Sequence, residues 1–170
     1  YGWEKLYAER MAHAFMRNRG IEVRIARFQN CFGPEGTWDG GREKAPAAIC
    51  RKVAQAEDGG SIEVWGDGTA IRAYTYVDDL VDGIYLLMQS DLREPATIGS
   101  SEFVTVDQLA TTAINISGKD INVNHVEGPV GVQARILDKK RIQSLGWDTK
   151  ISFEEGLSKT YDWILSQVEG

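Results

Sequence analysis

A tyrosine and a lysine, Tyr1 and Lys5, stand one helical turn apart at the start of the sequence. On a helix, residues at this spacing share one face. A nearby ammonium group favours the phenolate form of a tyrosine and lowers the pKa of its hydroxyl from the usual value of about 10. A phenol tuned in this way can act as a general base near neutral pH. The pair therefore predicts part of a proton-transfer site, although a packing residue beside a solvated charge gives the same spacing.

A second cluster of charges lies in the segment Gly-Gly-Arg-Glu-Lys-Ala-Pro that ends at Pro46. Proline suits the first turn of a helix, and the N-terminus of a helix attracts anions. Lys44 is therefore a candidate proton donor or phosphate contact, with Glu43 beside it and Lys52 about two turns further on. A solvated charge cluster is the alternative interpretation.

Asn30 follows a stretch of alternating β-branched residues and precedes a glycine-rich loop. In open α/β sheets, ligands bind at the carboxyl ends of strands. Asn30 is therefore a candidate for hydrogen bonds to a sugar or a diphosphate, with a simple turn amide as the alternative. The glycines of the following loop do not have the Gly-x-Gly-x-x-Gly spacing of a dinucleotide-binding fingerprint, so we reject that assignment.

Two arginines, Arg72 and Arg135, follow turn-like segments far apart in the sequence. Arginine suits bidentate recognition of phosphate groups. The two side chains would clamp a diphosphate if the fold brings them together. Each arginine taken alone fits a surface ion pair equally well.

Hydrophobic periodicity predicts helices and short strands that alternate along the chain. Helices are expected over residues 1–19, 46–56, 78–90, 107–116, 139–145 and 153–167, and strands over 21–28, 61–65, 71–77, 96–98, 103–106 and 121–125. Asp107 is expected to cap its helix, and Gly66-Asp67-Gly68 to form the turn of a hairpin. The alternation indicates an α/β class with mixed strand pairing.

The composition is that of a soluble globular protein of one domain, or of a large part of a bigger one, with 170 residues, 42% hydrophobic and 26% charged. The net charge of −6 argues against a nucleic-acid surface. No apolar run approaches the length of a membrane span. Cys31 and Cys50 make no disulfide framework and indicate a reducing, cytoplasmic compartment. Together with His13 and His125 they show no metal-ligand spacing, so no metal site is expected.

The motifs form an ordered series: Tyr-x-x-x-Lys, Arg-Phe-x-Asn-x-x-Gly-Pro, Trp-Gly-Asp-Gly, Tyr-Val-Asp-Asp, Ile-Gly-Ser, Arg-x-x-Asp and Leu-Gly-Trp. The series resembles the extended short-chain dehydrogenase/reductases, the NAD-dependent nucleotide-sugar epimerases and dehydratases. The resemblance covers essentially the whole chain. It implies the C-terminal part of a Rossmann-type fold plus a small mixed α/β substrate-binding domain. Residues 1–35 would end the NAD-binding domain and residues 36–170 would mainly bind substrate, with about 70–95 returning to the Rossmann sheet.

The resemblance also implies roles for individual residues. Tyr1 would take the proton of the C4 hydroxyl while NAD takes the hydride, and Lys5 would lower the pKa of Tyr1 and hold the nicotinamide ribose. The segment 36–48 is similar to epimerases that act on GDP-sugars at C3 and C5, with GDP-mannose as the expected substrate. Lys44 matches the general acid of that subgroup, whose partner cysteine would lie before Tyr1. The expected substrate contacts are Asn30, Glu43, Lys44, Lys52, Arg72 on the nucleotide side and Arg135 on the diphosphate.

The same resemblance implies a homodimer with no nucleic-acid or membrane partner. The 170 residues contain no glycine-rich NAD loop, so we expect this chain alone to be inactive. Two alternatives stay open. One is another epimerase or dehydratase of the family that acts on a UDP- or dTDP-sugar. The other is a sugar-nucleotide binding module without chemistry of its own.

Overall fold

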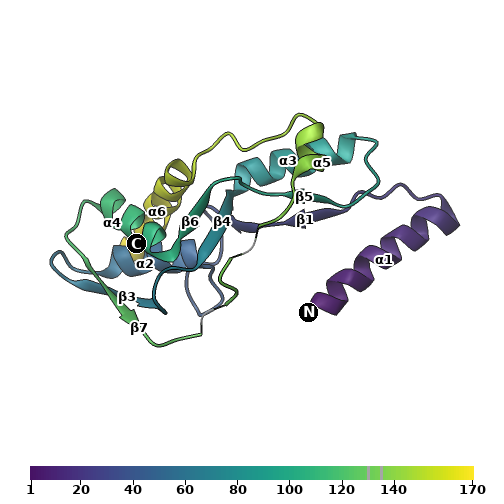
Figure 1. The fold of residues 1–170 in the computed structure, drawn as a ribbon. Helices are drawn as coiled ribbons and strands as arrows, with labels where there is room; N and C mark the ends of the chain where they lie inside the picture. Colours follow the sequence, from purple (N-terminus) through teal and green to yellow (C-terminus); the bar gives the residue numbers. More distant parts are fainter. Residues whose placement is uncertain (130, 135) are drawn as a thin grey trace.

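Helices and short strands alternate along the chain, as the sequence predicted (Figure 1). The structure is a computed structural model that describes residues 1–129, 131–134 and 136–170. Its elements are α1 (Gly2–Arg19), β1 (Ala26–Phe28), β2 (Asn30–Phe32), α2 (Ala45–Gln55), β3 (Ser61–Trp65), β4 (Ile71–Tyr76), α3 (Val77–Gln89), β5 (Ala96–Ile98), β6 (Phe103–Thr105), α4 (Val106–Ser117), β7 (Asn122–Val126), α5 (Lys140–Ser144) and α6 (Phe153–Glu169).

The strands form three small sheets with mixed pairing. β1 pairs in parallel with β5, and β3 pairs in parallel with β7. β4 lies between β2, to which it is parallel, and β6, to which it is antiparallel. The chain changes sheet at Gln29: Phe28 lies opposite Ile98 of β5, whereas Asn30 lies opposite Tyr74 of β4. The predicted α/β class with mixed pairing is confirmed.

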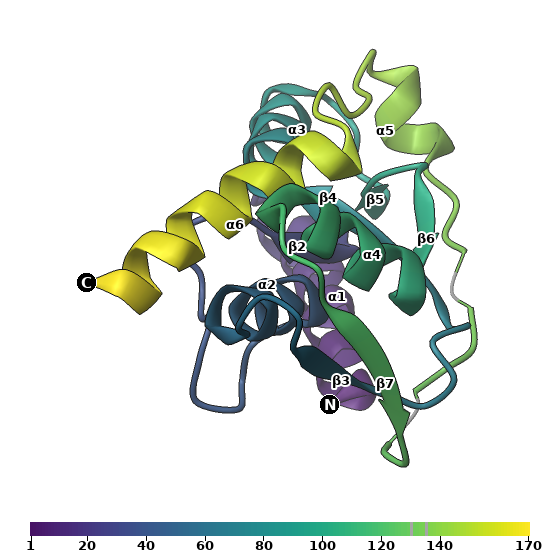
Figure 2. The ribbon, with the colours of Figure 1, turned by 90° about the vertical axis from the view of Figure 1, so that its left-hand side faces the viewer.

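Two hydrophobic clusters hold the molecule together. The larger one packs α2, α4 and α6 against β2 and β4 through the fully buried Val53, Leu109 and Leu157 (Figure 2). The smaller one joins α3, β5 and α5 through Leu87, Ile98, Ile142 and other apolar side chains. Because burial of apolar surface is the main favourable term in folding, these two clusters fix the strands whose ends carry the candidate site.

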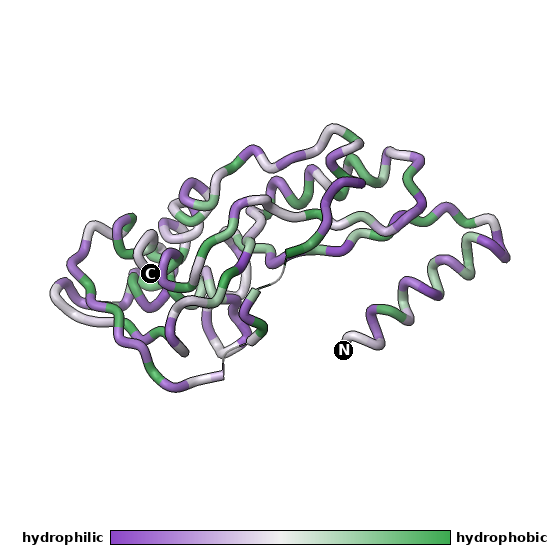
Figure 3. Tube along the Cα trace, viewed as in Figure 1, coloured by the Kyte–Doolittle hydropathy of each residue, from purple (hydrophilic) through white to green (hydrophobic). Residues whose placement is uncertain are grey.

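The first helix stands apart from this body (Figure 1). α1 has no buried residue among its described positions, and its apolar side chains are interleaved with polar ones along its length (Figure 3). Tyr1 and Trp3 are 88% and 84% exposed. One ion pair reaches across: Arg27 donates to both carboxylate oxygens of Glu9 at 2.7 and 2.6 Å. That hydrogen bond lowers the pKa of Glu9.

Two local predictions are wrong. Residues 61–65 and 71–76 do not form a hairpin, because β3 pairs with β7 and β4 pairs with β2 and β6. The turn between them is closed by the carboxylate of Asp67, which accepts hydrogen bonds from the backbone and hydroxyl of Thr69. The cap of α4 is Thr105 and not Asp107: the Thr105 side chain accepts from the backbone of Gln108, whose side chain accepts in return from the backbone of Thr105.

The strand predicted over residues 21–28 is also shorter in the structure, where β1 begins at Ala26. Residues 20–25 connect α1 to β1 without joining a sheet. β-branched residues at alternate positions favour an extended backbone, but a strand also needs a neighbour to pair with.

Candidate functional site

Tyr1 and Lys5 lie together, as their spacing predicted. The backbone N–H of Lys5 donates to the carbonyl of Tyr1 at 3.1 Å, which closes the first turn of α1. The ammonium nitrogen of Lys5 lies 5.1 Å from the centroid of the Tyr1 ring. The lysine therefore meets the face of the ring in a cation–π contact. The pair is exposed on α1, apart from the elements that carry the other candidate residues (Figure 1).

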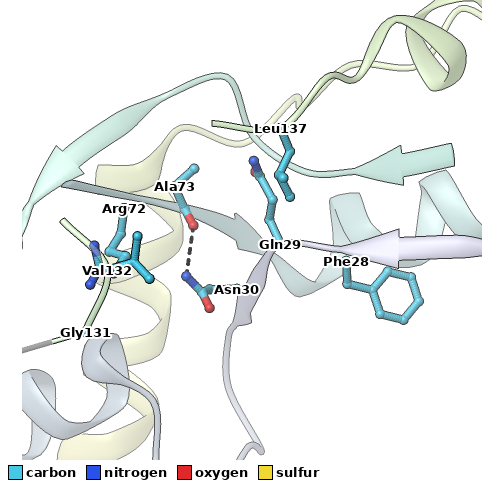
Figure 4. Close-up of a pocket in the computed structure, with 8 residues that line it drawn as sticks. All are labelled: Phe28, Gln29, Asn30, Arg72, Ala73, Gly131, Val132 and Leu137. Carbon is cyan, nitrogen blue, oxygen red and sulfur yellow. Dashed lines mark hydrogen bonds between the residues drawn. The ribbon is translucent and has the colours of Figure 1, made fainter. Parts of the chain in front are cut away.

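Asn30 and Arg72 line a cavity of about 250 Å³ at the point where the chain changes sheet, which we call the strand-switch cavity. The side-chain amide of Asn30 donates to the carbonyl of Ala73 at 3.5 Å (Figure 4). Arg72 donates from Nη1 to the carbonyls of Ile71 and Gln133, at 2.8 and 3.3 Å. The two side chains reach the cavity from neighbouring strands, because β2 and β4 are paired.

A larger cavity of about 480 Å³ lies between α2, β3 and β4, and we call it the large cavity. Glu43, Lys52 and Arg72 line it, so Arg72 belongs to both cavities. Lys52 donates to the carbonyl of Glu63 at 2.6 Å. Tyr74 also lines the large cavity, and burial raises its pKa to about 12. It therefore presents a neutral phenol that can donate a hydrogen bond.

Glu43 carries a buried carboxylate on the wall of the large cavity. Its side chain is only 8% exposed, and Oε1 accepts a hydrogen bond from Nη2 of Arg51 at 3.0 Å. Its own backbone N–H first, and then Arg51, hold the pKa of this carboxyl below its usual range, although burial opposes them. Oε2 is also buried and meets no hydrogen-bond partner among the described residues. A buried ionised oxygen without a partner is costly, so it marks a place where a ligand would donate.

Lys44 lines a third cavity, of about 270 Å³, with Arg42 and Cys31. It is the residue before α2 and has an extended backbone. Successive side chains on an extended backbone point in opposite directions, which explains why Lys44 and Glu43 line different cavities. The structure therefore groups Glu43, Lys52 and Arg72, joins Asn30 to them through Arg72, and separates Lys44. Arg135 lies outside the described residues.

The two cysteines are protonated at neutral pH. Burial raises the pKa of the Cys31 thiol, and that of Cys50 to about 12. A thiol is a weak nucleophile and a weak base compared with its thiolate.

Two features are absent from the described residues. No group of three or more His, Cys, Asp or Glu side chains is placed to hold a metal ion there. None of the helices described is long and apolar enough to cross a membrane.

Sequence reasoning missed two residues of the site. Arg51 supports Glu43 and also donates to the carbonyl of Trp38 at 3.1 Å. Gln29 lines the strand-switch cavity beside Asn30. For Arg51 the signal was its position beside Lys52, in the helix that follows Glu43. Gln29 gave no signal, because a single amide between a strand and a loop is common.

Sequence comparison identifies related proteins. A sequence model of the NAD-dependent epimerase/dehydratase family matches residues 1–99. GDP-mannose 3,5-epimerase of Arabidopsis thaliana is 44% identical over 170 residues, which cover 99% of this chain and 45% of that protein. UDP-glucuronic acid decarboxylase 1 of Xenopus tropicalis is 32% identical over 171 residues, which cover 99% of this chain and 39% of that protein.

The fold leads to the same family. The structure of a UDP-glucose 4-epimerase from Thermotoga maritima, solved with UDP-glucose, matches with a TM-score of 0.90 and 30% identity, and the match covers 99% of this chain and 54% of that one. The chain thus spans about half the length of the relatives it matches. The predicted Rossmann-type, extended short-chain dehydrogenase/reductase fold is confirmed. By sequence and by fold, this chain belongs to the NAD-dependent epimerase/dehydratase family.

Proposed function

We propose that this chain is the substrate-binding part of an NAD-dependent nucleotide-sugar epimerase that acts on GDP-mannose at C3 and C5. The observation that carries the proposal is the wall of the large cavity, where a buried carboxylate oxygen of Glu43 has no partner among the residues that the structure describes and the cations Lys52 and Arg72 lie nearby. The carboxylate would accept hydrogen bonds from hydroxyl or N–H groups, and the cations would hold phosphate oxygens. A nucleotide sugar offers both kinds of group. The 44% identity to a GDP-mannose 3,5-epimerase favours this substrate.

Different parts of such a ligand would lie in the two cavities. Arg72 lines both, so the diphosphate would lie at their junction. The sugar would extend into the strand-switch cavity beside Asn30, and the nucleoside into the large cavity. Arg135, as the second diphosphate contact, remains part of the proposal.

Tyr1 and Lys5 fit the nicotinamide end of NAD, because they offer a phenol and an ammonium on one exposed helical face. The diphosphate of NAD needs a glycine-rich loop that these 170 residues do not contain. NAD, when bound, would supply the acceptor for the C4 hydride of the sugar and the donor for its return. Tyr1 takes the proton of the C4 hydroxyl, and Lys5 stabilises the phenolate. A keto group at C4 would then acidify C3 and C5. For Lys44 to deliver a proton to the ring, its side chain has to turn out of the third cavity, which it lines in this structure.

The same proposal covers how the chain is divided into domains, whether it forms a dimer and where it acts in the cell. Residues 1–35 end the NAD-binding domain, residues 36–170 mainly bind substrate, and residues 70–95 return to the Rossmann sheet. The pairing of β4 with β2 and the packing of α3 on β5 support that return. A homodimer through the exposed α1, in the reducing cytoplasm, completes the proposal.

The test is proton exchange in a polypeptide that joins this chain to an NAD-binding half. With GDP-mannose in D₂O, we expect deuterium to enter C3 and C5, as read by NMR. Lys44→Ala should abolish this exchange and leave the C4 oxidation, measured as NADH absorbance, in place. Lys140→Ala, at an exposed position on α5, is the matched control. Exchange that persists in Lys44→Ala would contradict the role of Lys44.

A second candidate is an epimerase or dehydratase of UDP- or dTDP-sugars, which the match to the Thermotoga UDP-glucose 4-epimerase favours. The same assay with UDP-glucose and dTDP-glucose separates the two. Turnover of these substrates without turnover of GDP-mannose would replace the first candidate by the second. Binding of these ligands without any turnover would instead indicate a sugar-nucleotide binding module.

A further inference from the structure

Gln29 occupies the point where the chain leaves one sheet and enters another. Its backbone N–H still donates to the carbonyl of Ile98 in β5, at 3.1 Å, while the next residue, Asn30, already pairs with β4. The strand-switch cavity lies at this point, lined by Phe28 at the end of β1, Asn30 at the start of β2, and Arg72 and Ala73 of β4 (Figure 4). The cavity therefore lies next to the carboxyl end of β1, and the carboxyl ends of strands are where open α/β sheets bind ligands.

The side-chain amide of Gln29 has no partner among the described residues. Both Oε1 and Nε2 are buried, and neither makes a hydrogen bond there. Figure 4 shows the amide beside Leu137, on the side of the strand away from the Asn30 amide. The backbone of Gly99 closes the other side, and a Cβ at that position would overlap the Gln29 amide. Buried amides in native proteins nearly always have partners, so the pair of free groups requires something that the chain does not supply.

The wall behind this amide is fixed in place. Lys139 is buried and donates to the carbonyl of Ser100 and the hydroxyl of Ser101, both at 2.6 Å. The backbone N–H of Ser100 donates in turn to the hydroxyl of Thr75 in β4, at 2.9 Å. The chain next to Gly99 is thus anchored on two sides, and the Gln29 amide cannot gain a partner by a small shift of this loop.

The hydrogen-bonding groups of the Gln29 amide indicate which group of a ligand they would bind. An NH2 donor group and a C=O acceptor side by side match a hydroxyl group, which accepts and donates at once. A phosphate oxygen would satisfy only the donor, and an ammonium group only the acceptor. We propose that Gln29 binds a hydroxyl group of the sugar ring and so helps to select the sugar of the nucleotide-sugar substrate. This inference rests on the proposed function, which puts the sugar in the strand-switch cavity.

The test compares GDP-mannose with GDP in calorimetric titrations of the 170-residue chain. Gln29→Met keeps the length and volume of the side chain but removes both hydrogen-bonding groups. We expect the Kd for GDP-mannose to rise about tenfold, while the Kd for GDP, which lacks the mannose ring, stays within about twofold. Gln143→Met, the same change at an exposed position of α5, should alter neither.

A second set of titrations identifies the hydroxyl group that Gln29 binds. Among GDP-mannose analogues that each lack one hydroxyl, one should bind the wild type and Gln29→Met with equal affinity. If Gln29→Met fails to fold, Gln29→Asn, which keeps the amide but shortens its reach, takes its place in both sets of titrations. If the Gln29 variant loses the same affinity for GDP as for GDP-mannose, or loses none for either ligand, the inference is overturned and the proposed function stays intact. If the wild type binds neither ligand, the proposed function falls and the inference falls with it.

Discussion

At the scale of single residues, the carboxylate of Glu43 stands in an environment unlike that of an ordinary surface position. Its pKa is lowered in the folded protein. The ionised carboxylate is therefore more favourable in the folded state than in the unfolded chain and contributes to the free energy of unfolding. That contribution to stability is present above the unfolded pKa of about 4.5 and is lost as the pH falls through the lower, folded pKa.

Glu43→Gln therefore tests this linkage. We expect the difference in unfolding free energy between wild type and variant to be largest near pH 7 and to shrink as the pH falls below about 4.5. Urea unfolding followed by circular dichroism at several pH values measures it. A difference that stays constant, or grows on acidification, would show that the charge of Glu43 does not stabilise the fold.

The same scale shows what residue types alone can predict. The sequence indicated Glu43, Lys52 and Arg72 as charges able to meet a phosphate or a sugar, and the structure gathers them around one cavity. It could not show that Lys44, next to Glu43, lines a different cavity, because that depends on the extended backbone before α2. Gln29 was missed because its importance comes from its missing partners, which only a folded chain reveals.

At the scale of elements, a lysine from another part of the chain caps α2, the helix that carries Lys52. Nζ of Lys119 donates to the carbonyls of Val53, Ala54 and Ala56, at 3.1, 2.9 and 2.8 Å. These carbonyls at the C-terminal end lack partners within the helix, and a cation there also meets the favourable end of the helix dipole. Lys119→Met should cost about 1–3 kcal/mol of unfolding free energy in urea. Lys140→Met, on the exposed α5, is the control, and an equal effect of the two changes would contradict the capping role.

Asp79 connects two parts of the fold through its carboxylate. Its buried carboxylate accepts from the backbone N–H groups of Lys150 and Ile151, at 3.1 and 3.0 Å, and so ties α3 to the segment before α6. Asp79→Ala leaves both donors without a partner and should destabilise the protein by about 2–4 kcal/mol. The neighbouring Asp78 is exposed, and Asp78→Ala should cost much less. Similar thermal midpoints for the two variants would refute this account.

The elements also show where prediction from sequence fails. Strands at 61–65, 96–98 and near 71–76 were predicted correctly from alternation and β-branched residues. Their partners were not: the turn at Gly66-Asp67-Gly68 indicated a hairpin, yet β3 pairs with β7 far along the chain. Local patterns fix the conformation of a segment, whereas pairing depends on contacts that form only when distant segments pack together.

At the scale of the whole molecule, the exposed α1 is the feature with the clearest consequence. Neither hydrophobic cluster includes a residue of α1, although the helix carries exposed aromatic side chains such as Trp3 and Tyr7. Apolar surface of this kind favours association. We expect the 170-residue chain to self-associate with rising concentration in light-scattering measurements. A chain of residues 20–170 should remain folded and associate less, and loss of its folded circular dichroism spectrum would contradict the independence of the two clusters from α1.

In the proposed function, the junction of the two cavities binds the diphosphate of a nucleotide sugar, and the placement of the sugar and the nucleoside depends on this contact. Calorimetric titration of GDP-mannose into the wild-type chain and into Arg72→Ala tests that claim most directly. We predict saturable binding to one site in the wild type and a Kd at least about tenfold higher in the variant, because Arg72 would lose charge-assisted hydrogen bonds to phosphate. Absence of binding to the wild type, or equal affinity in the two proteins, would contradict it.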